Sequence, residues 1–234
     1  MKKGDNLGTS FTKIYERTMS QYIDDFALKK YNGSIIAMNQ DLQSYLLSAI
    51  PEFNTPISII EKIQDYTEAQ GMSEEFTGDG TTRSFTLSTE PVEDSLIEIS
   101  IDSVILPDGY AYDTETKTVT FDTPPEENAD ISISWYFCGE FTNDLNLIEQ
   151  GILSDLMIWK WLVRERDNIA DIRRLLRDTD YSLWSEEKTM TSKATLADIA
   201  REKASKSMKQ YAWSIYNTNI NKTFGLPNYA KIRY

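Results

Sequence analysis

The stretch that most constrains the fold runs from residue 75 to residue 138, where short alternating segments are separated by closely spaced turns. In Leu96–Asp102 every second residue is an isoleucine and the residues after these isoleucines are polar, which predicts a half-buried strand. Asp130–Phe137 repeats this alternation and places Trp135 on the inward side. Turns rich in Gly, Pro and Asp recur along the stretch. We therefore expect a small antiparallel β-sandwich or barrel here.

Both flanks of this stretch show helical periodicity, because apolar residues recur at spacings of three and four. The pattern is interrupted by strands and then resumes, which predicts one α-helical bundle with an inserted domain, an α+β fold. We expect Gly71 to end the third helix, Asn143 or Asp144 to cap the fourth, and residues 181–192 to be a connection. The expected helices are Phe11 to about residue 30, Asn39–Ala49, Pro56–Gln70, Leu145–Arg166, Asp167–Arg177 and Leu196–Asn219. The expected domains are a helical domain made of residues 1–74 and 139–222, the β domain at 75–138 and an extended docking tail at 223–234.

Composition excludes several kinds of active site. The chain has 234 residues, no histidine and a single cysteine, Cys138. A Ser-His-Asp triad and a zinc site built from Cys and His are therefore excluded. One cysteine allows no disulfide within the chain, which is typical of a reducing compartment. Cys138 follows an apolar strand, so we interpret it as a buried structural thiol, with a reactive thiol as the alternative.

The net charge of −13 is concentrated in the predicted β domain. Between Glu74 and Cys138 there are 15 acidic residues and two basic ones, Arg83 and Lys117. The rest of the chain balances, with 22 of the 37 acidic and 22 of the 24 basic residues. No segment is apolar over the length of a membrane span, and the N-terminus lacks the apolar region of a signal peptide. We expect a soluble protein that is made in the cytoplasm and binds no membrane.

Adjacent carboxylates are the candidates for acid–base or metal chemistry. Neighbouring side chains on a strand or helix point apart, so we interpret these pairs as solvated acidic loops. The Gly78–Gly80 turn resembles part of a calcium loop with Asp79 as a ligand, but the alternating Asp/Asn ligands and the distal Glu are missing. We expect no cofactor, no metal and no catalytic residue. The four pairs are Asp24-Asp25, Glu74-Glu75, Glu93-Asp94 and Glu126-Glu127.

A group of basic residues near the end of the sequence could contact nucleic acid phosphates. Asp198 and Glu202 lie among them, so an ordinary solvated helix face is the alternative interpretation. No aromatic stacking platform accompanies the group, and we expect no sequence-specific binding. The candidate DNA-contacting residues are Arg173, Arg174, Arg177, Lys203, Lys206 and Lys209, with Arg201 beside them.

Two apolar features indicate contacts between proteins. The helix predicted at 145–166 carries an apolar stripe, including Trp159 and Trp161, that is wide enough to be buried from more than one side, in the bundle or against another subunit. The end of the sequence holds further apolar and aromatic residues in a segment that we predict to be extended. Left in water they would favour aggregation, so we expect this tail to dock, preferably on a neighbouring chain. Its residues are Phe224, Leu226, Pro227, Tyr229, Ile232 and Tyr234.

Five short patterns in the β stretch carry a family resemblance. They are F-x-G-D-G-T-T-x-x-F-x-L at Phe76–Leu87, I-x-I-x-I at Ile97–Ile101, Y-x-Y-D at Tyr110–Asp113, V-x-F-x-x-P-P at Val119–Pro125 and I-x-I-x-W-Y at Ile131–Tyr136. Together they resemble a β domain found in virion proteins of tailed bacteriophages. The helical flanks and the aromatic tail are similar to head–tail connector (head completion adaptor) proteins. The combination most resembles the neck ring proteins of podoviruses or crAss-like phages.

The resemblance implies a non-enzymatic virion protein, made in the host cytoplasm, that forms a homo-oligomeric ring of twelve subunits. Such a ring extends the portal, lines the DNA channel with non-specific contacts to packaged DNA, serves genome ejection and joins the head to further neck or tail proteins. The tail, Phe224–Tyr234, would dock on the portal or on a neighbouring subunit. The alternative is a receptor- or carbohydrate-binding virion appendage that reads its ligand with Tyr110, Tyr112 and Trp135, although the inward position of Trp135 argues against it. A hydrolase that uses carboxylates is a third hypothesis.

Overall fold

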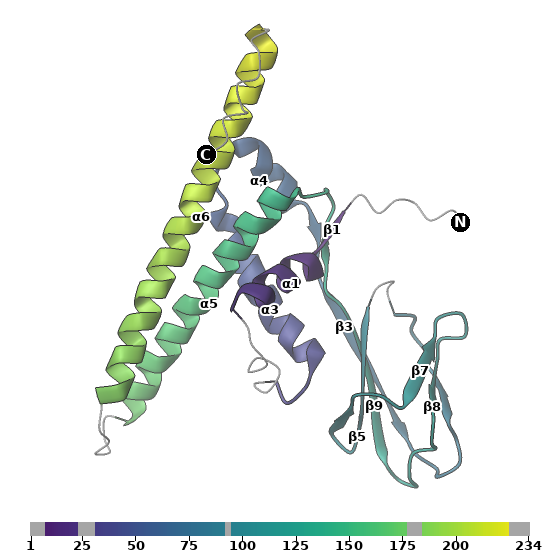
Figure 1. Cartoon of the computed structure of the whole chain (residues 1–234). Helices are drawn as coiled ribbons and strands as arrows, with labels where there is room; N and C mark the ends of the chain where they lie inside the picture. Colours follow the sequence, from purple (N-terminus) through teal and green to yellow (C-terminus); the bar gives the residue numbers. More distant parts are fainter. Residues whose placement is uncertain (1–7, 23–30, 92–94, 177–183, 225–234) are drawn as a thin grey trace.

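The computed structural model describes residues 8–22, 31–91, 95–176 and 184–224, with the side chains of 8–20, 31–91, 95–167 and 195–219. Within these residues the protein is a mixed α/β structure, 48% helical and 24% strand, with five α-helices and antiparallel sheets (Figure 1). None of the sheets closes into a barrel. No helix in the described part of the chain is long and apolar enough to cross a membrane.

The C-terminal half of the helical part is a long hairpin of two helices, α5 (Leu147–Leu176) and α6 (Trp184–Phe224), which lie side by side in Figure 1. The two helices run antiparallel. Glu149 on α5 contacts Tyr211 on α6, whereas Asp155, further along α5, contacts Lys203, which comes before Tyr211 on α6. The seam of α6, the side that faces α5, consists of small and apolar residues. They are Ala197, Ala200, Ala204, Met208, Tyr211 and the half-buried Ile215.

The shorter helices pack against this hairpin. They are α1 (Phe11–Tyr22), α3 (Ile35–Ala49), the 3₁₀ turn η1 (Ile50–Glu52) and α4 (Ile57–Gln64). α1 and α3 both contact α5, and their buried side chains form one core with the first half of α5. Fully buried aromatic rings at the centre of this core include Phe11, Tyr15, Phe53 and Phe141.

Several predicted helix boundaries are wrong. The predicted helix Pro56–Gln70 ends at Gln64, and Gly71 lies in strand β3 (Gln70–Thr77) instead of ending a helix. This strand starts before the predicted boundary at residue 75. Its pairing with the long strand β9 (Asp130–Phe137) along all eight residues outweighs the local helical periodicity.

The C-terminal helices are also longer than predicted. α5 is continuous through Asp167, where we expected a new helix, and α6 begins at Trp184, inside the stretch expected to be a connection. α3 begins at Ile35 and not at Asn39. Thr223 and Phe224, assigned to the extended tail, belong to α6. Tertiary packing along the α5–α6 hairpin overrides weak local signals for helix ends.

Residues 70–137 form two antiparallel sheets that share one core. The larger sheet has the order β3-β9-β5-β6, with β5 at Leu96–Ile101 and β6 at Val104–Leu106. The smaller has the order β4-β8-β7, from Ser84–Thr86, Thr118–Phe121 and Tyr110–Asp113. The predicted alternation is confirmed, because Ile99 pairs with Ile133 and both are fully buried. The other buried residues of this core are Phe85, Leu87, Val119, Phe121, Ile131 and Trp135.

A third sheet and helix α3 join the β structure to the helices. The third sheet has the order β1-β10-β2, from Thr9–Ser10, Glu140–Phe141 and Tyr66–Thr67. α3 lies against the outer face of β5, where Glu98 Oε1 accepts a hydrogen bond from the Ser34 hydroxyl at 3.0 Å and Oε2 accepts one from the Ile36 amide at 3.3 Å. A carboxylate at a helix N-terminus is favoured by the free amides and the helix dipole. The polar face of β5 therefore caps a helix instead of facing water.

Candidate interaction surfaces

A buried polar cluster holds α4, α5 and α6 together. The side chain of Glu149 is 2% exposed, and it accepts hydrogen bonds from Lys62 Nζ and the Tyr211 hydroxyl, each at 2.7 Å. Asn146 Nδ2 donates to the same Tyr211 hydroxyl at 2.7 Å. Burial and the hydrogen bond to Glu149 raise the pKa of Tyr211, so it stays a neutral donor. Every member has a partner, so the cluster is best explained as a structural clamp between three helices.

The same glutamate completes the cap of α5. Asn146 Oδ1 accepts hydrogen bonds from the Ile148 and Glu149 amides, while Glu149 Oε2 accepts one from the Asn146 amide at 2.8 Å. This reciprocal arrangement is a capping box. The predicted caps, Asn143 and Asp144, are therefore wrong, although the sequence spacing Asn146-x-x-Glu149 was a readable signal for the observed cap.

The outer face of α6 carries an exposed aromatic pair that sequence reasoning missed. Trp213 and Tyr216 are 64% and 57% exposed, and their rings stack at 5.8 Å between centroids with an interplanar angle of 29°. Lys206 and Lys209 are exposed on the same helix, three residues apart, and Lys209 lies four residues before Trp213, so all four share the face opposite the seam. We call these four residues the α6 outer face. The sequence signal for this face was the spacing of three residues between Trp213 and Tyr216, which places both rings on one side of a helix.

A groove of about 390 Å³ lies on the other side of the hairpin, between α1, α5 and α6. Arg17, Lys203, Ser207 and Asp155 provide its polar wall, in which Asp155 is ion-paired with Lys203 and Arg17 is not paired with any described residue. The exposed side chains of Leu147 and Ile148 form an apolar rim. We call it the Arg17 groove. It combines cationic donors with apolar surface, which suits a carboxylate attached to an apolar group.

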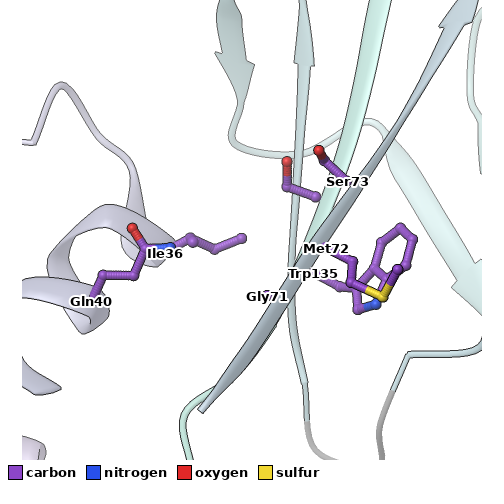
Figure 2. Close-up of a pocket in the computed structure, with 7 residues that line it drawn as sticks. Ile36, Gln40, Gly71, Met72, Ser73 and Trp135 are labelled. Atoms are coloured by element: carbon purple, nitrogen blue, oxygen red, sulfur yellow. The ribbon is translucent and has the colours of Figure 1, made fainter.

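A second groove, of about 360 Å³, runs between α3 and the edge strand β3 (Figure 2). Ile36 and Gln40 approach from the helix, while Gly71, Met72 and Ser73 come from the strand. Within the described residues, β3 is paired on one side only, with β9. The groove is open and contains no charged side chain, and it therefore offers no chemistry for catalysis.

The predicted interface tryptophans are half-buried within their own chain. Trp159 packs against the helical core, with Lys160 Nζ 4.4 Å and the Arg201 guanidinium carbon 5.1 Å from its ring centroid. Trp161 packs against the same core and against a second buried cluster, which includes Leu162 of α5 and Ala200 of α6. Their role in contacts between subunits stays a prediction. The tail residues Leu226, Pro227, Tyr229, Ile232 and Tyr234 lie outside the described residues, and so does the side chain of Phe224.

The predicted DNA-contacting residues are not one continuous group in the described structure. Lys203 forms an ion pair with the buried Asp155, at 2.7 Å between Nζ and Oδ1. Lys206 and Lys209 are exposed on the α6 outer face. Arg177 and the side chains of Arg173 and Arg174 lie outside the described residues. Lys203 therefore has a structural partner, and contact with DNA stays a prediction for the whole set.

Two acidic residues of the β part, Asp79 and Asp113, order turns. Both carboxylate oxygens of Asp79 accept hydrogen bonds from Thr81 and Thr82, which hold the pKa of Asp79 well below its usual range. Asp113 makes a similar turn with Glu115 and Thr116. Among the described residues no group of three His, Cys, Asp or Glu side chains is placed to hold a metal ion.

The structure also shows the positions of Cys138 and of the aromatic residues proposed to bind a receptor or a carbohydrate. Cys138 is buried, as expected, and burial raises its pKa to about 11. Trp135 is 3% exposed inside the β core, where Tyr110 and Tyr112 are half-buried against the same cluster. These aromatic residues therefore form no exposed platform for a receptor or a carbohydrate. The pair Asp24-Asp25 lies outside the described residues, as does Glu93-Asp94.

Comparison with known proteins leaves the family of this chain open, since no protein-family model and no curated protein matches it.

Proposed function

We propose that this protein is a structural component of a tailed-bacteriophage particle, a ring in the neck that extends the portal, lines the DNA channel and joins head to tail. In this proposal the helices form a bundle, and the two sheets of residues 70–137 form a small inserted β-sandwich. The ring is a homo-oligomer of twelve copies whose other partners are the portal, further neck or tail proteins and packaged DNA.

The observation that carries the proposal is the α6 outer face. A stacked tryptophan and tyrosine, each more than half exposed, are costly to leave in water and are enriched at protein interfaces. They lie on the longest helix, which continues past the start of α5 in Figure 1. A long hairpin whose aromatic face is exposed among the described residues is suited to assembly.

The distribution of charge supports the same proposal. The acidic β part and the balanced helical part give each copy two surfaces of different charge. Copies with complementary surfaces associate head to tail, and such heterologous contacts close into a ring when the rotation between copies allows it. An acidic surface facing a channel would also repel DNA and allow it to slide.

The experiment is a measurement of mass for the purified full-length chain by mass photometry, alone and after mixing with a candidate portal protein. We expect a discrete oligomer of high order or a stable complex with the portal. In a Trp213→Ala/Tyr216→Ala double variant we expect at least a tenfold loss of assembly, because interface aromatics dominate binding energy. Met72→Ala removes an exposed apolar side chain from β3 and serves as the matched control. A chain that stays monomeric at all concentrations and does not bind the portal would contradict the proposal.

A further inference from the structure

Arg17 on α1 has an unusual environment in the Arg17 groove. Its Nε atom is buried without a hydrogen-bond partner, and the guanidinium makes no ion pair with the described residues. It lies directly against the backbone of α5, because a Cβ atom at Gly151 would be 2.9 Å from Nη2. Arg17 as a whole is half-buried, and a buried donor such as its Nε is costly to leave without an acceptor.

The other residues that line the groove indicate which kind of anion can bind there. Lys203 is ion-paired with Asp155, yet its side chain is 57% exposed and keeps free donors toward the groove. Leu147 and Ile148 are 73% and 55% exposed at the rim. A free phosphate would leave these apolar side chains uncovered. A peptide carboxylate next to an apolar residue satisfies both parts of the groove.

Such a segment lies at the opposite end of the molecule, in the loop between β8 and β9. There Glu126 and Glu127 are exposed, and their carboxylates make no hydrogen bond or ion pair in the described structure. They follow the partly covered Pro124 and the buried Pro125. The loop is held by Gly78, which exchanges backbone hydrogen bonds with Ala129 and Asn128, each at 2.9 Å. A Cβ atom at Gly78 would lie 2.2 Å from the Glu126 carbonyl oxygen, so the close approach that orders the loop requires glycine.

This loop cannot easily reach the groove of its own chain. The eight residues of β9 separate the loop from the helical part by about 26 Å. Figure 1 shows β9 extending away from the helices toward the far end of the sheets. The groove and the loop are therefore separate surfaces of one chain with opposite charge, which is the requirement for a head-to-tail contact between copies.

We propose that the Arg17 groove of one copy receives the Pro124–Glu127 loop of a second copy, with a loop carboxylate on the Arg17 guanidinium and Pro124 against Leu147 and Ile148. The contact is heterologous, because groove and loop are different surfaces, and it repeats from copy to copy. It rests on the proposed assembly function and specifies the interface that forms it.

Charge reversal tests the contact on the full-length chain. We expect Arg17→Glu and, separately, Glu126→Lys/Glu127→Lys to raise the concentration for half-maximal assembly about tenfold or more, because like charges then meet. The two changes combined should restore assembly. Asp108→Lys/Glu115→Lys reverses two exposed carboxylates elsewhere in the same β part and should leave assembly unchanged.

Cross-linking keeps the test independent of any folding defect in Arg17→Glu. Ser207→Cys copies are mixed with Glu127→Cys copies and treated with a short bismaleimide, to which the buried Cys138 should stay inert. A covalent dimer that needs both variants supports the contact, and Asp108→Cys in place of Glu127→Cys should give none. If the wild-type protein assembles but charge reversal and cross-linking have no effect, this contact is wrong while the proposed function stands. If the wild-type protein stays monomeric but binds the portal, this contact is wrong while the proposed function stands. If it stays monomeric and does not bind the portal, both are wrong.

Discussion

Charged residues are used differently in the two parts of the molecule. In the helical part, Glu149 is buried and links three helices that are distant in sequence. In the β part, Asp79 and Asp113 are exposed and bond to residues two or three positions away. The net charge of the helical part is zero and that of the β part is −13. We nevertheless expect the stability of the helical part to depend more on its ionic contacts, because they are buried.

The net charge of a region therefore does not indicate how much its charged residues contribute to stability. A buried carboxylate without its partners is strongly destabilising, whereas an exposed one is solvated by water. Some acidic residues of the β part bond over longer ranges, such as Glu74, which accepts hydrogen bonds from Ser88 and Thr89. Glu98 on β5 accepts hydrogen bonds from the start of α3 and so connects the two regions. The following predictions test the comparison in order of decreasing effect.

The largest effect is expected for Glu149→Ala. The change leaves Lys62 and Tyr211 without their acceptor and removes half of the α5 capping box. We expect the free energy of unfolding to fall by about 3–5 kcal/mol, the range for breaking a buried ion pair. Urea unfolding followed by circular dichroism measures it. Glu202→Ala, an exposed carboxylate on α6, should change stability by less than about 0.5 kcal/mol. Equal effects of the two variants would contradict the comparison.

An intermediate effect is expected for Glu98→Ala at the junction. The Ser34 hydroxyl and the Ile36 amide lose a charged acceptor, which we expect to cost about 1.5–3 kcal/mol. Hydrogen exchange of the first turn of α3 should rise more than exchange in the β core. Glu75→Ala removes the same charge from an exposed position on the same sheet and should have no measurable effect on α3.

A smaller effect, visible as pH dependence, is expected for Asp79. Hydrogen bonds hold its pKa below the unfolded value, so its contribution to stability is present above about pH 4 and is lost as the pH falls toward the folded pKa. The wild-type protein should therefore lose more stability than Asp79→Ala between about pH 5 and pH 3. Urea midpoints at both pH values measure this. The control variant Asp108→Ala should show the same dependence of stability on pH as the wild-type protein. If Asp79→Ala also shows the wild-type dependence, the hydrogen bonds of Asp79 do not contribute to stability.

The smallest effect concerns the thiol of Cys138, at the end of the β core beside the helical core. Burial raises its pKa to about 11, so at about pH 8 it should react with a thiol reagent far more slowly than free cysteine. Glu98→Ala should accelerate the reaction if the junction opens as a unit. A rate unchanged in that variant would indicate that the two regions separate elsewhere.

Alternation and turn chemistry predicted most strands of the β part from sequence, because each strand has one buried face and a period of two. Ile99, Ile133 and Trp135 are buried as the alternation indicates. β3 was assigned partly to a helix because only its pairing with β9 makes Gln70–Glu74 a strand. α5 and α6 were predicted as shorter pieces, because helix continuity across polar segments comes from packing along the hairpin.

The candidate interaction surfaces were less accessible to sequence reasoning. Trp159 and Trp161 carry the strongest aromatic signal, yet both are half-buried within the chain. The exposed pair is Trp213 and Tyr216, and only the position of α5 shows which face of α6 is covered. Arg17 carries no sequence motif at all, and its unpaired state follows from its position against Gly151.

The sequence by itself determined the class of elements, the acidic nature of the β part and the exclusion of histidine chemistry, because these depend on residue type and local spacing. The tertiary structure alone decided which charges are paired, which aromatic residues face water and where a cationic groove opens. Those properties depend on contacts between residues far apart in the chain, such as Lys62 with Glu149 and Arg17 with Gly151, which no local pattern encodes.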